Sequence, residues 1–131
     1  MTAVEPMTQS AGPILVVDDD SGTRLAIQWM LEEDGFLVDT AIDGTQALER
    51  AANRTPALVV LDLRLPGVDG TMVAAQLRTE HGAALPILLI TADDRAEQTA
   101  HQVGAYAYLC KPFDLDDLVA AVQRGLNRLT G

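Results

Sequence analysis

Two groups of aspartates follow runs of apolar residues, and their position suits them to chemistry. Asp62 ends the apolar run Ala57–Leu61, and Asp18 and Asp19 follow the run Ile14–Val17. Continuous Val and Leu runs of this kind are typical of strands that are buried on both faces of a parallel sheet. In open α/β folds, ligands bind at the carboxyl ends of such strands. The sequence therefore predicts a cluster of carboxylates at one edge of a sheet.

Two further polar residues follow later apolar runs. Thr91 comes after residues 86–90 and Lys111 after residues 105–110, and Lys111 is the only lysine in the chain. Its compact ammonium is a point charge, unlike the planar guanidinium of arginine. We favour a role in the site over the alternative of an ordinary surface lysine, because Lys111 follows a strand. Pro112 makes a cis Lys111–Pro112 peptide bond a candidate.

These residue types support phosphoryl transfer to a carboxylate. Three close carboxylates repel one another, so at neutral pH they need a proton or a cation. Mg²⁺ suits oxygen ligands of this kind, with Mn²⁺ as an alternative. An aspartate can act as a nucleophile and form an aspartyl phosphate. A hydroxyl and an ammonium can then hold the remaining phosphoryl oxygens.

Five strands alternating with five helices are expected to position these residues. The alternation predicts right-handed crossovers, parallel strands and helices on both faces of the sheet. We expect a flavodoxin-like, doubly wound (βα)5 three-layer α/β sandwich with strand order 2-1-3-4-5. The predicted strands are 14–17, 36–40, 57–62, 86–90 and 105–110, and the predicted helices are 21–34, 44–53, 70–80, 94–103 and 114–129.

Composition limits the classes of function that the chain can have. Its 131 residues suggest one domain, and its formal net charge of −10 excludes direct nucleic-acid binding. No apolar stretch reaches membrane-spanning length, and no secretory signal is present, so we expect a cytoplasmic protein. We interpret residues 1–13 as a flexible tail and 14–131 as the domain. The lone Cys110 is expected to be a buried small hydrophobe.

Several of these motifs, in this order and spacing, resemble the receiver domain of two-component response regulators. The resemblance covers about residues 14–129 and is carried by Ile14–Asp19, Leu61–Gly70, Thr91–Ala92 and Tyr108–Phe113. It implies that Asp62 is the phosphoacceptor. It also implies a Mg²⁺ site in which Asp19 binds directly, Asp18 binds through water, and the backbone carbonyl of Arg64 is a further ligand. Thr91 and Lys111 would bind the phosphoryl group, and Tyr108 would turn inward when Thr91 moves.

The resemblance also implies partners. A histidine kinase or phosphotransfer protein would supply the phosphoryl group, and the chain would catalyse only its own phosphorylation and dephosphorylation. The face formed by residues 94–103, 105–110 and 114–129 would signal to a protein effector or to a C-terminal output domain. A stand-alone regulator and a fragment of a longer regulator or hybrid kinase both remain open. So do a monomer and a weak phosphorylation-dependent dimer.

Two alternatives from other classes are weaker. A Mg²⁺-dependent phosphatase of the haloacid dehalogenase type would need an acid two residues after Asp62, where Arg64 stands. A flavin or nucleotide carrier of the same topology would need a Gly-rich phosphate loop after the first strand. The aspartates at that position would repel phosphate.

Two pairs of residues suggest features beyond the family pattern. Arg64 and Asp93 should overhang the pocket, and we hypothesise that they pair and slow hydrolysis of the phosphoryl group. The alternative is two separately solvated charges. Leu25 and Trp29 lie at i,i+4 on the side of the first helix opposite its apolar stripe. We hypothesise that they contact the kinase or phosphotransfer protein. The alternative is that Trp29 packs against the last helix.

Overall fold

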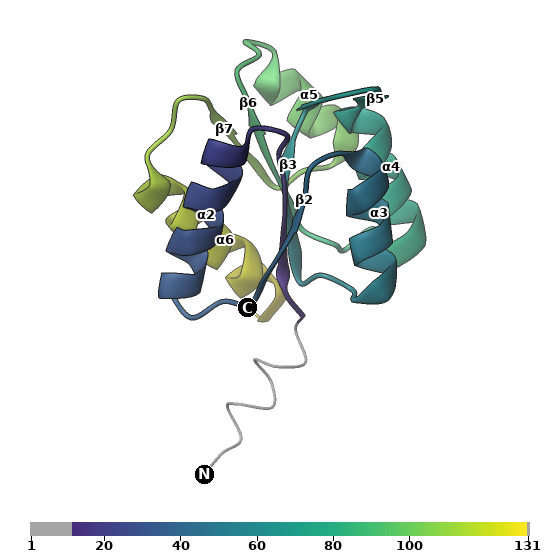
Figure 1. Ribbon diagram of the computed structural model, residues 1–131. Coiled ribbons are helices and arrows are strands. Elements are labelled where there is room, and N and C mark those ends of the chain that lie inside the picture. Colours follow the sequence, from purple (N-terminus) through teal and green to yellow (C-terminus); the bar gives the residue numbers. More distant parts are fainter. Residues whose placement is uncertain (1–11, 131) are drawn as a thin grey trace.

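A five-stranded parallel sheet forms the centre of the protein in a computed structural model that describes residues 12–130 (Figure 1). The strand order is β2-β1-β3-β6-β7. Counted among the sheet strands alone, this is 2-1-3-4-5, so the predicted flavodoxin-like topology is confirmed. The strands are β1 (Ile14–Val17), β2 (Val38–Ala41), β3 (Leu58–Asp62), β6 (Ile87–Thr91) and β7 (Ala107–Cys110).

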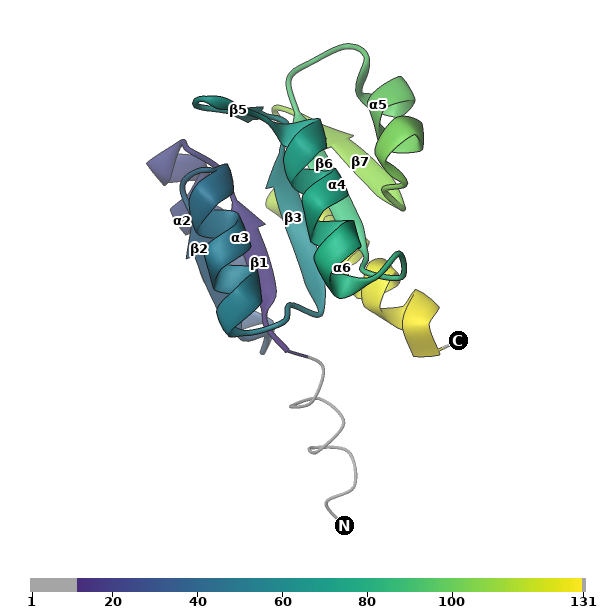
Figure 2. The same cartoon turned by 90° about the vertical axis from the view of Figure 1, so that its right-hand side faces the viewer.

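Helices cover both faces of this sheet, as the sequence predicts (Figures 1 and 2). Apolar residues of α2 and α6 pack on one face, and those of α3, α4 and α5 pack on the other. The protein therefore has two separate hydrophobic layers with the sheet between them. The helices are α2 (Ser21–Glu33), α3 (Gly44–Asn53), α4 (Gly70–His81), α5 (Ala96–Val103) and α6 (Leu115–Thr130).

The place of each strand in the sheet explains its burial. Every residue of β1, β3 and β6 is buried, because these strands have neighbours on both sides and helices on both faces. In contrast, β7 is an edge strand in which half-buried and exposed residues alternate. Cys110 is one of the exposed residues. The prediction that it is buried was wrong. The predicted order already placed this strand at the edge, but the apolar run did not reveal which of its alternating side chains face solvent.

Aspartates begin three of the helices at the carboxyl edge of the sheet. The side chains of Asp20, Asp43 and Asp69 accept hydrogen bonds from backbone N–H groups in the first turns of α2, α3 and α4. These N-caps satisfy donors that a helix start otherwise leaves free. They fix where each helix begins, and so fix the loops that join it to the strand before it.

A short hairpin interrupts the connection after β3. Its strands, β4 (Arg64–Leu65) and β5 (Val68–Asp69), pair antiparallel around Gly67, which has a φ of 72°. At Gly70, a Cβ would come within 2.7 Å of the Leu63 carbonyl oxygen, so only glycine lets α4 start this close to the chain. The sequence predicted only a turn here. The hairpin matters for the site because it begins two residues after Asp62.

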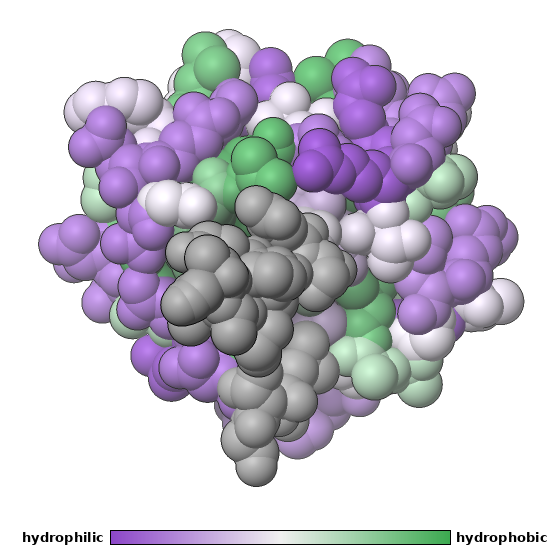
Figure 3. Space-filling model, turned by 90° about the horizontal axis from the view of Figure 1, so that it is seen from below, coloured by the Kyte–Doolittle hydropathy of each residue, from purple (hydrophilic) through white to green (hydrophobic). Residues whose placement is uncertain are grey.

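Pro13 lies at the opposite end of the molecule, just before β1. Residues 1–11 of the predicted tail lie outside the described residues. Pro13 belongs to the fold, because its carbonyl accepts a hydrogen bond of 2.8 Å from the Ala57 N–H. Seen from below, the visible part of this end is mostly polar, with small hydrophobic groups between polar residues (Figure 3). Across residues 12–130, no helix combines the length and apolar character needed to cross a bilayer.

Candidate functional site

Asp18, Asp62 and Lys111 meet at the carboxyl edge of the sheet. Strands β1 and β3 are neighbours, with Val17 paired to Leu61, so the aspartate after each of these residues lies at the same level. The Lys111 ammonium lies 2.9 Å from Asp18 Oδ2 and 2.9 Å from Asp62 Oδ2. Asp18 is 0% exposed and Asp62 3% exposed. One ammonium therefore bridges two buried carboxylates.

Backbone groups hold the other oxygen of each carboxylate. Asp18 Oδ1 accepts a hydrogen bond from the Asp20 N–H at 2.9 Å, and Asp62 Oδ1 accepts one from the Arg64 N–H at 3.0 Å. Each bond reaches two residues along the chain, a local turn that aspartate forms readily. Both carboxylates are thus fixed by the loop that follows their own strand.

Burial and charge act in opposite directions at this site. Burial raises the pKa of the Asp62 carboxyl above its ordinary value, and the nearby Asp18 charge adds to this increase. The Arg64 N–H and Lys111 lower the pKa, but do not cancel the increase. At Lys111, burial opposes the charge, yet the bonds and charges of Asp62 and Asp18 together raise the pKa of its ammonium. Lys111 is therefore cationic at neutral pH.

Asp19 completes a set of oxygen atoms that fits a divalent cation. One carboxylate oxygen from each of Asp18, Asp19 and Asp62 lies within 4.8 Å of the others. Asp19 is exposed, and within residues 12–130 its carboxylate accepts no hydrogen bond, so its oxygens face solvent. Hard oxygen ligands with access to water are those that Mg²⁺ prefers.

Thr91 lies on the other side of Asp62 from Asp18. It is the last residue of β6, which pairs with β3, and it is fully buried. Its Oγ1 accepts a hydrogen bond of 3.0 Å from the Asp93 N–H. Its carbonyl accepts one of 2.8 Å from the Lys111 N–H. The hydroxyl therefore keeps its own proton to donate, beside the strand that carries Asp62.

The predicted pairing of Arg64 with Asp93 is wrong. Asp93 Oδ1 instead accepts a hydrogen bond of 2.9 Å from the Arg95 N–H and lies 3.7 Å from Arg95 Nε. A local turn brings the Asp93 carboxylate to a residue two positions later, and this contact is closer than any to Arg64. The Arg95 N–H is also the main reason that the pKa of Asp93 is lowered. The charge of Arg64 makes a smaller contribution of the same sign.

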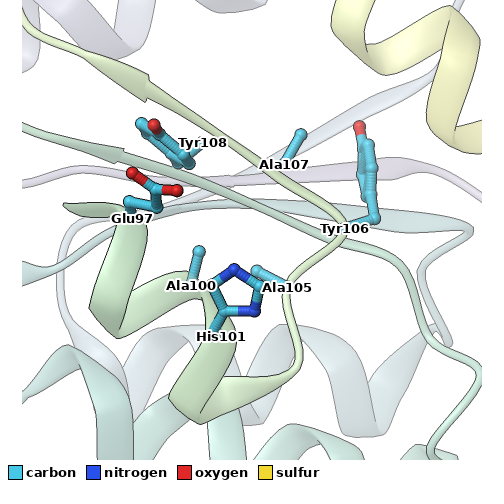
Figure 4. A pocket seen from close by; sticks show the side chains of 7 residues that line it. All are labelled: Glu97, Ala100, His101, Ala105, Tyr106, Ala107 and Tyr108. Atoms are coloured by element: carbon cyan, nitrogen blue, oxygen red, sulfur yellow. The ribbon is translucent and has the colours of Figure 1, made fainter.

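The remaining predicted residues lie outside this cluster. Tyr108 is 37% exposed and lines a cavity of about 270 Å³ between α5 and β7, together with Glu97 and His101 (Figure 4). Leu25 and Trp29 on α2 are 59% and 64% exposed. Trp29 is therefore not packed against the last helix. The Lys111–Pro112 peptide bond is cis.

Sequence reasoning missed one contact at this edge. Arg24 Nη1 donates a hydrogen bond of 2.8 Å to the backbone carbonyl of Asp18. The chain has eight arginines, and nothing in their spacing singles out the one that bonds a loop carbonyl. Only the position of Arg24 one turn into the helix after the acidic loop hinted at this contact.

A family model and the similar proteins of known sequence agree on one family. A family model described as "Response regulator receiver domain" matches residues 14–123. The DNA-binding transcriptional regulator NtrC of Escherichia coli (strain K12) is 39% identical over 118 residues, covering 88% of this chain and 25% of that protein. Response regulator MprA of Mycobacterium sp. (strain KMS) is 43% identical over 117 residues, covering 88% of this chain and 50% of that protein.

Solved structures agree with these relatives. The receiver domain of NtrX from Brucella abortus has a TM-score of 0.81 and 34% identity, covering 87% of this chain and 98% of that one. This chain spans between a quarter and a half of the length of the two curated relatives. It belongs to the family of response regulator receiver domains.

Proposed function

We propose that Asp62 accepts a phosphoryl group from a histidine kinase or a phosphotransfer protein, in a reaction that depends on Mg²⁺ or Mn²⁺. One observation carries this proposal. A buried carboxylate at the end of the central strand is bound to the chain's only lysine, beside a second acid that shares the same ammonium. The protein is a signalling phosphoacceptor, and it catalyses only its own phosphorylation and dephosphorylation.

The chemistry is a displacement at phosphorus. A carboxylate oxygen of Asp62 forms a bond to phosphorus, and the bond from phosphorus to the donor nitrogen breaks, leaving its electron pair on the donor. Lys111 then pairs with a phosphoryl oxygen, and the Thr91 hydroxyl donates to another. Asp18, Asp19, Asp62 and the Arg64 carbonyl would hold the metal ion, which supplies positive charge against the phosphoryl group.

The same residues argue against the two rival functions. A phosphatase of the haloacid dehalogenase type needs an acid where Arg64 stands, so no general acid would release the product. A flavin or nucleotide carrier needs backbone donors after β1, but this loop presents Asp18 and Asp19. A carboxylate cluster repels a resident phosphate unless a metal ion is present.

Signal output is proposed for the face formed by α5, β7 and α6, which contains the cavity beside Tyr108 (Figure 4). Helix α5 is weakly anchored to the rest of the domain, because its N-cap residue, Arg95, makes no side-chain capping hydrogen bond and only Ala96 and Ala100 are buried. A weakly held helix is easily biased between two positions. Inward rotation of Tyr108 when Thr91 binds the phosphoryl group would change this face. The partner that binds this face is a protein effector or an output domain.

The same proposal includes the bounds of the domain, its compartment and its oligomeric state. Residues 14–131 form the receiver, which acts in the cytoplasm as a monomer or as a weak dimer that phosphorylation favours. Of the tail expected at residues 1–13, the part before Pro13 is proposed to take no part in phosphoryl transfer. The acidic composition agrees with a protein partner, since a net charge of −10 disfavours nucleic acid.

Acetyl phosphate provides the test of the acceptor. With acetyl phosphate and Mg²⁺, the wild-type protein is expected to gain one phosphoryl group that alkali or hydroxylamine removes. Asp62→Asn should gain none, because an amide is not a nucleophile at phosphorus. Intact-mass spectrometry measures both, and Asp34→Asn, at the far end of α2, is the matched control. Labelling of Asp62→Asn equal to that of wild type would contradict the proposal. Rapid multiple turnover of phosphate esters would favour the phosphatase.

Arg64 and Asp93 are proposed to lengthen the life of the phosphoryl group, each by hindering the attacking water. Because the two side chains do not pair, their effects should add. Arg64→Ala and Asp93→Ala should each speed dephosphorylation by about two- to fivefold, because each truncation removes a side chain that hinders the attacking water. Decay of the phosphorylated protein after removal of the donor measures this. Rates equal to those of wild type and of the exposed control Arg54→Ala would refute the idea.

Leu25 and Trp29 are proposed as contacts for the kinase or phosphotransfer protein. Both are exposed on α2, which begins at the edge that carries Asp18. Trp29→Ala and Leu25→Ala should slow transfer from a phosphorylated partner about tenfold, as truncation of an interface anchor does. Labelling by acetyl phosphate should not change. Met72→Ala, an equally exposed apolar residue on α4, is the control, and transfer that Trp29→Ala leaves unaffected would exclude the contact.

A further inference from the structure

The loop after β1 is held by contacts at every polar group of Asp18. Its N–H donates to the Ala41 carbonyl at 3.1 Å, which extends the pairing of β1 with β2. Its carboxylate oxygens accept from the Asp20 N–H and from Lys111. Its carbonyl accepts from Arg24 Nη1 at 2.8 Å. This carbonyl bond is the only one of the four that depends on a side chain outside the cluster of Asp18, Asp62 and Lys111.

We propose that Arg24 is a positioning residue for the metal site: it tethers the Asp18 carbonyl, so that the 18–20 loop keeps Asp18 and Asp19 in place for a divalent cation. Arg24 is half-buried on the first turn of α2. Its own N–H donates to the Asp20 carbonyl at 2.9 Å, so main chain and side chain hold the two ends of this loop. This inference rests on the metal site of the proposed function.

Among the proposed metal ligands, Asp19 depends most on this tether for its position. It lies between the two tethered carbonyls, those of Asp18 and Asp20, and its exposed carboxylate accepts no bond from residues 12–130 that could hold it. Its position therefore follows from the backbone on either side. Partners that orient metal ligands usually change metal affinity by 10- to 100-fold when they are removed.

Electrostatics alone predicts the opposite effect, and this makes the proposal testable. Arg24 carries a positive charge close to the acidic cluster, since its Nη1 lies 2.8 Å from the carbonyl oxygen of Asp18. Removing a cation from beside a cation site should strengthen Mg²⁺ binding if charge were its only contribution. Loss of the tether should weaken binding. The sign of the change therefore separates the two roles.

Calorimetric titration with Mg²⁺ alone is the experiment. Arg24→Met keeps the apolar stem and the helix propensity but removes the donor and the charge. We expect it to bind Mg²⁺ about tenfold more weakly than wild type. Arg24→Lys, which keeps a donor and the charge, should recover most of the affinity. Arg50→Ala is the matched control, because Arg50 Nε also donates to a backbone carbonyl near this edge, that of Thr40 in β2 at 3.0 Å, but outside the cluster.

Each outcome decides between the alternatives. Equal or tighter Mg²⁺ binding by Arg24→Met, with wild type binding normally, overturns the positioning role and leaves the proposed function intact. A wild-type protein that binds no Mg²⁺ overturns the metal site itself. If Arg24→Met does not fold, as judged by circular dichroism, Arg24→Gln replaces it, because its shorter amide removes the charge and cannot reach as far. The same sign of change then decides.

Discussion

Repulsion between the Asp18 and Asp62 carboxylates is the interaction on which the site depends. The parallel pairing of β1 and β3 brings both acids to one edge, where each is almost completely buried. Like charges so placed are unstable unless a cation lies between them. Lys111 supplies it from the end of β7, two strands away from β3, with 2.9 Å contacts to both. Four adjacent strands, β1, β3, β6 and β7, therefore assemble these three side chains.

In this arrangement Lys111 could exchange its carboxylate partners for a phosphoryl group. In the absence of other ligands, Lys111 balances two acids, and Asp19 adds a third negative charge without a bond of its own. The positive pKa shift of Asp62 means that its ionised form is held at a cost. A metal ion and a phosphoryl group would together supply the missing cation and a new acceptor for the lysine.

Much of the fold and the cluster could be predicted because the sequence signals were local. Apolar runs ending in Asp18, Asp62, Thr91 and Lys111 predicted strands, and parallel topology then required their ends to meet. The features that the sequence did not predict depend on distant parts of the chain or on side-chain geometry. The predicted order placed the run ending at Cys110 at the sheet edge, but it did not show which side chains of that run face solvent. Asp93 contacts Arg95 and not Arg64 because of the local turn geometry. Arg24 donates to the carbonyl of Asp18, six residues earlier in the chain. Side-chain rotamers, which periodicity does not encode, decide such contacts.

The proposed function requires an ionised Asp62 despite the cost of burying its charge, because a protonated carboxyl is a poor nucleophile. The pKa of Asp62 in the folded protein lies above its ordinary value of 3.8. The destabilisation by its charge is therefore absent below pH 3.8, grows between pH 3.8 and the raised pKa, and is complete above the raised pKa. Denaturant unfolding of wild type and Asp62→Asn without metal ions, across pH, measures this cost. Asp62→Asn should be more stable than wild type at pH 7, and the difference should vanish in acid. A variant less stable than wild type at pH 7 would contradict the account.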